Sequence, residues 1–405
     1  MKKVLILLFQ FCALMTINAQ NKIVLSNTNI IDGISMSEKK NMMVFISNGK
    51  IESIKKAGSK YKGYYLVDLK GMYLLPGFID AHTHIRSLDA AKRALESGVT
   101  TTRSASTPYF QDVSIREMVK SGALVGPDMI ATGVFVTPNL GETILADIRL
   151  KDLFGGVNNE DELRKVVQVN AERGVDFIKT RGTERAGLPQ TDPRKQTYTE
   201  SQLKIIVDEA KKFNIPVMAH AHGDEGGYAA VKAGVKSIEH GTYLTERTLK
   251  LMKRMDTFLV PTFTTVVDLT QPGGDYDDPV LIIRGQHMLP SLEKTIKMAY
   301  KMGIKIATGA DTGYGPNSTT RVGMEITNFV NLGMKPIDAI QSATIIGAEL
   351  LGIANKTGTI SIGKEADLIV VTSNPLNDIR TIQDVVFVMS NGKIGLNRLP
   401  FEKDN

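Results

Sequence analysis

Apolar stretches of strand length alternate with amphipathic stretches of helical length along most of the chain. Eight apolar runs, each followed by a turn rich in polar residues or glycine, are predicted as strands. They are Leu74–His84, Thr100–Ser106, Asp128–Thr137, Asp176–Arg181, Pro216–His222, Ser237–Gly241, Thr257–Phe263 and Lys305–Asp311.

Helical patterns separate these runs. They are Ala90–Glu96, Glu160–Arg173, Glu200–Lys212, Gly226–Ala233, Glu246–Met255 and Leu292–Met302. Strands that alternate with helices pair in parallel through right-handed crossovers. The pattern therefore predicts an α/β fold, and eight units favour a closed (β/α)8 TIM barrel over residues 74–354. A doubly wound open sheet is the alternative.

The two flanks of this region have a different pattern. Residues 22–73 and 355–396 contain short alternating strands, and the tripeptides Asn48-Gly49-Lys50 and Asn391-Gly392-Lys393 are typical of tight hairpin turns. We therefore expect both chain ends to assemble into one small β-sandwich domain beside the barrel.

The N-terminal residues 1–19 resemble a secretory signal peptide. Lys2 and Lys3 precede the apolar run Val4–Ile17, and Ala19 supplies a small residue for cleavage. The sequence thus predicts export to the periplasm or the medium, with a buried strand or helix as the alternative. No later stretch is long and apolar enough to predict a membrane span.

Composition narrows the classes of function. Hydrophobic residues make up 42% of the 405 positions, which is typical of a globular protein, and the net charge of +6 is spread without basic blocks. This pattern gives no indication of nucleic-acid binding. The one cysteine, Cys12, lies in the predicted signal. The mature chain would therefore have no disulfide, thiol nucleophile or cysteine-bound zinc.

Five of the six histidines stand at ends of predicted strands, at positions 82, 84, 220, 222 and 240. In a barrel the carboxyl ends of the strands meet at one mouth, where active sites form. His82 and His84 are two residues apart, so on an extended strand their side chains face the same side. An isolated pair of this kind is commonly a surface feature, but the shared position of all five favours a metal site.

Two further charged residues end predicted strands. Asp311 follows the eighth apolar run, where it is either a helix cap or a metal ligand and proton acceptor. Lys179 ends the fourth strand, where an ammonium group would be repelled by nearby cations. It either turns away, as an exposed or paired lysine, or changes its chemistry.

These segments resemble the amidohydrolase superfamily, in its imidazolonepropionase-like branch with Xaa-Pro and Xaa-Arg dipeptidase members. The resemblance runs from about residue 22 to residue 396. Its motifs are the segments 76–84 (PGFIDAHTH), 177–179 (FIK), 220–223 (HAHG), 237–241 (SIEHG), 308–311 (TGAD) and 358–367 with 374–376 at the C-terminal end. The ordered set is specific, whereas His-x-His alone is weak.

The resemblance implies a binuclear centre. His82 and His84 would bind one divalent ion together with Asp311, and His220 and His240 would bind the second. Lys179, carboxylated on its side-chain nitrogen, would bridge the two ions. Zinc is the expected metal, although histidine and carboxylate ligands also suit manganese or cobalt.

The family pattern also implies a mechanism. A hydroxide shared by the two ions would attack the scissile carbonyl, and Asp311 would take its proton and deliver it to the leaving amine. His222 would contact the developing oxyanion or another substrate group. His222 and Asp311 are thus the expected catalytic residues.

Substrate contacts are less defined by the sequence. The second strand reads Arg103-Ser104 where relatives usually carry Arg-Asp, and Arg181 follows Lys179 where relatives often have a smaller residue. Arg181 and Arg185 could grip a substrate carboxylate, or each could be a solvated loop arginine. Tyr243 is a further candidate contact, and residues 264–292 are expected to form a loop over the barrel mouth.

The sequence therefore predicts an exported metal-dependent amidohydrolase for a dipeptide or N-acyl amino acid. A related hydrolase of esters, lactones, carbamates or phosphotriesters is one alternative, and a non-catalytic metal-binding protein is another. The expected partner is a small amide or peptide substrate, and a homo-oligomer is compatible with the sequence.

Overall fold

The computed structural model describes residues 22–399. The predicted signal peptide, residues 1–19, lies outside this range. Within it, no helix has both the length and the hydropathy that crossing a membrane requires.

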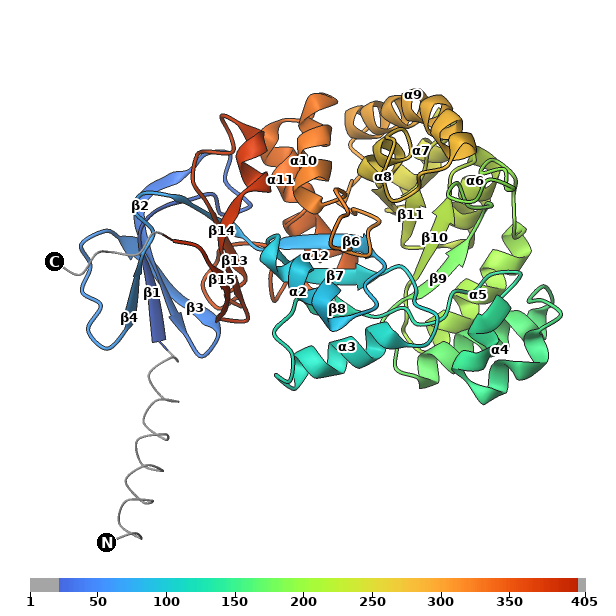
Figure 1. Cartoon of the computed structure of the whole chain (residues 1–405), viewed down its shortest axis with the longest axis horizontal. Coiled ribbons are helices and arrows are strands. Elements are labelled where there is room, and N and C mark those ends of the chain that lie inside the picture. Colours follow the sequence, from blue (N-terminus) through green and yellow to red (C-terminus); the bar gives the residue numbers. More distant parts are fainter. Residues whose placement is uncertain (1–21, 400–405) are drawn as a thin grey trace, which may run out of the picture.

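Strands from both chain ends form one eight-stranded sheet (Figure 1). They are β1 (Lys22–Ile30), β2 (Lys39–Ser47), β3 (Lys50–Lys56), β4 (Tyr65–Asp68), β5 (Tyr73–Pro76), β13 (Leu368–Val371), β14 (Val385–Ser390) and β15 (Lys393–Asn397). The two ends meet where β13 pairs antiparallel with β5, which in turn pairs parallel with β1. All eight strands belong to a single hydrogen-bonded sheet, so the predicted sandwich of two sheets is not confirmed.

The two predicted hairpin turns are present and touch each other. Asn48 and Gly49 have φ of 50° and 77°, and Asn391 and Gly392 have φ of 51° and 74°. These left-handed pairs are the conformation that short hairpin turns require. A Cβ on Gly392 would lie 2.4 Å from the Cα of Gly49, so only glycine permits this approach of the two ends.

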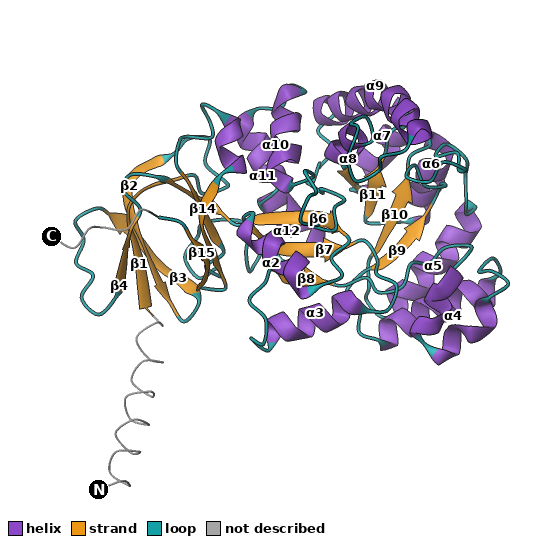
Figure 2. Ribbon diagram, viewed as in Figure 1, coloured by secondary structure: helices purple, strands orange, loops and turns teal. Residues whose placement is uncertain are grey.

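The middle of the chain contains two parallel sheets, which are covered by helices (Figure 2). One sheet has β6 (Phe78–Thr83), β7 (Val99–Ser104) and β8 (Asp128–Ile130). The other has β9 (Ile178–Arg181), β10 (Val217–Ala221), β11 (Ser237–His240) and β12 (Phe258–Val260). Between successive strands run α2 (Leu88–Glu96), α3 (Gln111–Lys120), α4 (Glu160–Glu172), α5 (Glu200–Lys212), α6 (Asp224–Ala233) and α7 (Glu246–Met255), with the short 3-10 helices η1 (Gly141–Ala146) and η2 (Ile148–Leu153) before α4.

The predicted eighth strand, residues 305–311, is reduced to isolated bridges at Ile306 and Thr312. Single backbone hydrogen bonds nevertheless connect the two parallel sheets. Ala307 N donates to Leu259 O at 2.9 Å and Ala81 N donates to Thr308 O at 2.9 Å, while Val136 N donates to Lys179 O at 2.9 Å on the other side. The arrangement is TIM-barrel-like, but one continuous closed sheet is not present.

The predicted mouth loop over residues 264–292 is largely helical. It contains α8 (Phe263–Asp268) and the first half of α9 (Pro279–Lys301), so only residues 269–278 form a loop. Asp278 caps α9 and Pro279 occupies its first turn, where a missing N–H costs nothing. Pro290 lies inside α9. The turn residues Pro272-Gly273-Gly274-Asp275 do lie in that loop, but they indicate only their own neighbourhood, and the segments on either side are helical.

After the mouth region the chain returns to the sheet of the two ends. It passes through α10 (Val322–Asn331), α11 (Pro336–Ser342) and α12 (Ile345–Leu351), and the 3-10 helix η3 (Ile379–Gln383) precedes β14. Capping explains why some predicted boundaries agree with the structure. Asn159 with Glu162 begins α4, and Thr199 with Gln202 begins α5, each as a reciprocal capping box.

Candidate metal centre

The five predicted histidines and Asp311 converge on one cavity of about 110 Å³. β6 and the residue after it supply two histidines, β10 and the residue after it supply two, and β11 supplies the fifth. Two groups within the described residues can each hold an ion, since their ligand atoms lie within 4.8 Å of one another. One is His82, His84 and Asp311, and the other is His220, His222 and His240.

In the first group the carboxylate of Asp311 faces both imidazoles of the His-x-His pair. Its Oδ1 is 3.4 Å from Nε2 of His82 and 3.2 Å from Nε2 of His84. Because the two histidines lie on the same side of an extended strand, both can approach one carboxylate. The spacing argument from the sequence therefore agrees with the geometry.

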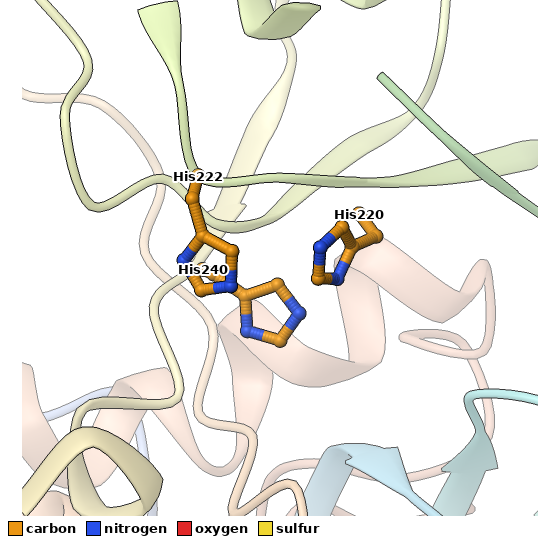
Figure 3. Close-up of side chains that lie close together, drawn as sticks. All are labelled: His220, His222 and His240. Carbon is orange, nitrogen blue, oxygen red and sulfur yellow. The ribbon is translucent and has the colours of Figure 1, made fainter. Parts of the chain in front are cut away.

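The second group consists of three stacked or edge-on imidazoles (Figure 3). The ring centroid of His240 is 4.5 Å from that of His220 and 4.5 Å from that of His222, and the His220 and His222 rings are 4.8 Å apart. The sequence paired only His220 with His240 as ligands. The structure places His222 within the same group.

Each imidazole is held by a hydrogen bond at one ring nitrogen. Nδ1 of His82 contacts Glu239 at 2.7 Å, and Nδ1 of His84 contacts the carbonyl of Ser106 at 3.2 Å. Nδ1 of His222 contacts the hydroxyl of Thr242 at 2.8 Å, Nδ1 of His240 that of Thr262 at 2.7 Å, and Nε2 of His220 the carbonyl of Glu184 at 3.0 Å. The opposite nitrogen of each ring is then the atom that can bind an ion, as in known metal sites.

Burial keeps four of the five histidines neutral, namely His82, His220, His222 and His240. It lowers the pKa of His82 to about 4 and that of His222 to about 3. Burial, together with neighbouring histidines and Lys179, also holds the pKa of His220 and His240 well below the usual 6.5. Neutral imidazole is the form that coordinates metals.

The Asp311 side chain, in contrast to these four histidines, stays charged in the cavity. Burial would raise the pKa of this carboxyl, but His82, His84 and Lys179 outweigh it and lower the pKa well below its usual range. The carboxylate is therefore ionised at neutral pH. It is available as an oxygen ligand or a proton acceptor.

Lys179 ends in the same cavity and is 2% exposed. Its Nζ has no hydrogen-bond partner among the described residues. Burial lowers the pKa of this amine to about 8, although Glu239 and Asp311 act to raise it. An orphaned buried amine is costly, so the geometry excludes the simple interpretation of an exposed or paired lysine.

A buried ion pair beneath the cavity was not expected from the sequence. Glu239 accepts hydrogen bonds from Arg103 at 2.9 Å and from Ser237 at 2.5 Å, besides its contact with His82. Burial would raise the pKa of Glu239, but the charge of Arg103 and the bond from His82 lower it to about 2. Glu239 is thus an acceptor, so Nδ1 of His82 donates. The sequence feature that could have indicated this ion pair is the carboxylate of Glu239 within a predicted strand.

Several cavity residues have strained backbones. Ser106, His240, Thr262 and Asp311 line the cavity with φ of 106°, 72°, 49° and 46°. Residues other than glycine rarely adopt positive φ, and such outliers cluster at functional sites. This strain points to the same cavity as the histidines.

The three predicted substrate contacts lie in different places. Arg185 lines the cavity. Arg181 is buried, with its guanidinium 4.5 Å from the ring centroid of Phe135, and burial lowers its pKa to about 10. Tyr243 lines a separate surface depression, where its hydroxyl lies 3.2 Å from Nδ1 of His287.

The model of the amidohydrolase family matches residues 73–395. This span includes every candidate ligand. The chain belongs to the amidohydrolase family.

Individual relatives agree with this assignment. The chain is 28% identical to ochratoxinase from Aspergillus niger over 363 residues, which cover 79% of this chain and 75% of the relative. It is 22% identical to imidazolonepropionase from Thermoanaerobacter pseudethanolicus, over 83% of this chain and 85% of the relative. A solved Xaa-Pro dipeptidase with methionine bound in its active site aligns with a TM-score of 0.83 at 28% identity, covering 92% of this chain and 99% of that one.

This amidohydrolase is an enzyme that hydrolyses carbon–nitrogen bonds of the amide type. Members of its superfamily use a divalent metal site, and the two histidine-containing groups lie where such a site is expected. The predicted family and enzyme class are therefore confirmed.

Proposed function

We propose that this amidohydrolase is an exported, two-metal enzyme that cleaves a dipeptide or an N-acyl amino acid. The observation that carries the proposal is the position of Lys179. Its buried, unpartnered amine lies in one cavity with two separate groups of three ligands. A single metal ion would occupy only one of these groups, and Lys179 would then have no hydrogen-bond partner among the described residues. Two ions, one in each group, would give the lysine a role as a ligand between them.

The residues present fit two divalent ions. His82, His84 and Asp311 would hold one, His220 and His240 the other, and Lys179, carboxylated to an anion, would bridge them. Carboxylation would replace the buried ammonium with an anionic carbamate, whose oxygen atoms can bind metal ions. When bound, divalent ions such as Zn²⁺ lower the pKa of water and polarise a carbonyl oxygen.

Asp311 would act as the proton carrier. It is ionised at neutral pH and faces the His-x-His pair, with His240 Nδ1 4.0 Å from its Oδ2. From this position the carboxylate would accept a proton from the attacking water and deliver it to the leaving amine. Such general acid–base transfer contributes about 10²–10⁴-fold to a rate.

His222 would stabilise the substrate. Its ring stacks on His240, and its Nδ1 is held by Thr242, which fixes the orientation of Nε2. Either role fits this fixed ring: a hydrogen bond to the developing oxyanion, or participation in binding the second ion.

The rest of the cavity wall supports a carboxylate-bearing substrate with an apolar part. Arg86 and Arg185 supply positive charge, and an apolar side is formed by Phe135, Val266, Leu269 and Tyr276. A guanidinium binds a carboxylate through two parallel hydrogen bonds. Arg181 would support Arg185 from the buried side, and Tyr243 would contact longer substrates outside the cavity.

The wider organisation is proposed on the same basis. Residues 22–73 and 355–396 would form one domain and residues 74–354 the (β/α)8 barrel domain, in which the bridges at residues 306 and 312 stand in place of a regular eighth strand. Residues 1–19 would direct export to the periplasm or medium and be removed near Ala19.

The test is a substrate screen with metal-loaded protein prepared in bicarbonate. Dipeptides and N-acyl amino acids are followed by release of free amine, and matched esters, lactones and phosphotriesters are followed by release of acid. Amide hydrolysis that disappears on chelation and returns with Zn²⁺ supports the proposal. Ester or phosphotriester cleavage without amide cleavage would contradict it, as would two ions bound with no turnover of any substrate.

A further inference from the structure

The connection between β9 and α5, residues 182–199, forms part of the cavity wall. Arg185, Ala186 and Gly187 line the cavity. The carbonyl of Glu184, one residue earlier, accepts a hydrogen bond from Nε2 of His220 at 3.0 Å. One short segment therefore touches both a candidate ligand and the space for substrate.

A single side chain from a distant helix holds this segment. Arg284 of α9 donates from Nη1 to the carbonyls of Ala186 and Leu188, at 2.6 Å each. It donates from Nη2 to the carbonyls of Pro189 at 3.0 Å and Thr191 at 2.6 Å. All four partners are backbone carbonyls, so the guanidinium holds the main chain of this segment rather than its side chains.

Only arginine can make this set of contacts. A guanidinium presents five N–H donors in a rigid plane, whereas the ammonium of lysine is a compact point with three rotatable donors. Without a cation between them, four carbonyl oxygens that point at one place would repel one another. The charge of Arg284 therefore compensates a backbone arrangement that is unfavourable alone.

The opposite side of the segment is restrained by packing. A Cβ on Gly187 would lie 2.7 Å from Cε1 of Tyr276, which also lines the cavity. Glu184 N donates to Lys195 O at 3.0 Å, and Thr191 Oγ1 donates to Leu188 O at 2.8 Å. The segment is thus held between Arg284 and the Tyr276 ring.

We propose that Arg284 is a positioning residue that sets the path of residues 184–191, and through it the orientation of His220 and the place of Arg185. The effect on metal binding depends only on the Glu184–His220 contact. The effect on substrate rests on the function proposed above. Within the described residues the hydrogen bonds of Arg284 go to backbone carbonyls of the segment and not to His220 or Arg185.

The first experiment compares Arg284→Ala with the parent by hydrogen exchange and by metal titration against a chromogenic chelator. We expect faster exchange of the amides in residues 184–191 and about tenfold weaker binding of one ion, the lower end of the loss seen when a partner of a ligand is removed. Lys297→Ala is the control, since this lysine lies on the same helix in an exposed pair with Glu293. It should change neither readout.

The second experiment separates positioning from loss of charge. Arg284→Lys retains the charge and reaches fewer carbonyls, so it should recover part of the metal affinity and of the exchange protection. Gly187→Ala retains Arg284 and displaces the segment from the Tyr276 side, so it should reproduce both effects of Arg284→Ala. This variant also keeps the test decisive if Arg284→Ala fails to fold.

Kinetics on any amide found in the screen supply the third readout. A shift of about 1 Å in a positioned group can reduce kcat/KM about 100-fold, and we expect most of this loss in KM because Arg185 would contact substrate. Unchanged exchange of residues 184–191 and unchanged metal affinity in both Arg284→Ala and Gly187→Ala would overturn the inference. Failure of the substrate screen would overturn only the proposed function.

Discussion

The backbone N–H of Asp311 donates to the carbonyl of His82 at 2.8 Å, and the Asp311 carboxylate lies 3.4 Å from the His82 ring. The two residues are far apart in the sequence and are joined by main chain and side chain together. Buried Asp80 reinforces this junction, because its Oδ1 accepts from Ala310 N at 3.0 Å and from His82 N at 3.1 Å. The candidate proton carrier is therefore fixed to the strand that bears the first ligands.

Asp311→Asn tests the proton carrier. The amide retains the size and one oxygen of the carboxylate but cannot accept a proton, so kcat should fall by about 10²–10⁴-fold. Some metal should remain bound, as measured by elemental analysis of the purified variant. Near-normal turnover would remove Asp311 from the proposed mechanism.

Lys179 is tested by its chemistry. Protein prepared in ¹³C-bicarbonate should give a carbamate carbon signal in NMR spectra, because burial lowers the pKa of this amine to about 8 and leaves more of the reactive neutral form. Lys179→Met keeps the apolar stem and should lose the signal and the second ion. A signal of equal strength in this variant would show that another amine is modified.

Arg185→Met tests recognition of a substrate carboxylate. Hydrogen bonds to charged groups contribute about 1.5–3 kcal/mol, so KM for a dipeptide should rise about 10- to 100-fold. The same substrate with its terminal carboxylate amidated should bind parent and variant alike. Steady-state kinetics on the two substrates decide the question, and an equal change for both would indicate general damage to the cavity.

Glu325 predicts a pH dependence of stability. This carboxyl accepts hydrogen bonds from Phe263 N at 2.8 Å and Thr264 N at 2.7 Å, and burial raises its pKa to about 7, although these bonds act to lower it. The folded state keeps the proton at pH values where the unfolded chain has lost it. The contribution of Glu325 to the free energy of unfolding should therefore fall as pH rises from 4.5 to 7, by about 3 kcal/mol for a shift of this size.

Glu325→Gln isolates this contribution from that of the buried histidines. Histidines with lowered pKa have the opposite sign, since they favour the folded state more as pH rises through the same window. Denaturant unfolding of metal-free parent and variant at several pH values gives the difference. Asp80 and Asp367, whose pKa burial also raises to about 7, contribute equally to both proteins. The free energy of unfolding of the parent minus that of the variant should therefore fall between pH 4.5 and 7, and parallel curves would contradict the assignment to Glu325.

Much of the site could be predicted because its signals are local. His82 and His84 face one side by strand geometry alone, and strand ends in a parallel α/β fold meet at one edge. The helical capping boxes at Asn159 and Thr199 likewise act within a few residues. These signals do not depend on the rest of the chain.

Other features could not be predicted because each depends on partners distant in sequence. Nothing in the sequence near His82 indicates that its Nδ1 donates a hydrogen bond to Glu239. Nor does it indicate that Arg103 forms an ion pair with Glu239. Residues 264–292 were predicted as a loop, yet α8 and α9 occupy most of that range and α9 continues through Pro290. Residues 305–311 were predicted as a strand from the apolar pattern alone, but only isolated bridges at Ile306 and Thr312 form there, and Asp311 has a left-handed backbone.

By itself, the sequence determined the α/β pattern, the amidohydrolase family and the residue types that can hold metal, because periodicity and motif order are properties of the chain alone. Tertiary structure decided which nitrogen of each imidazole is available to an ion, that His222 joins His220 and His240, and that buried Lys179 has no hydrogen-bond partner among the described residues. It also decided that Arg284 donates hydrogen bonds to backbone carbonyls between residues 186 and 191, in the segment that contacts His220. These are matters of distance and desolvation, and both exist only once strands and helices have packed.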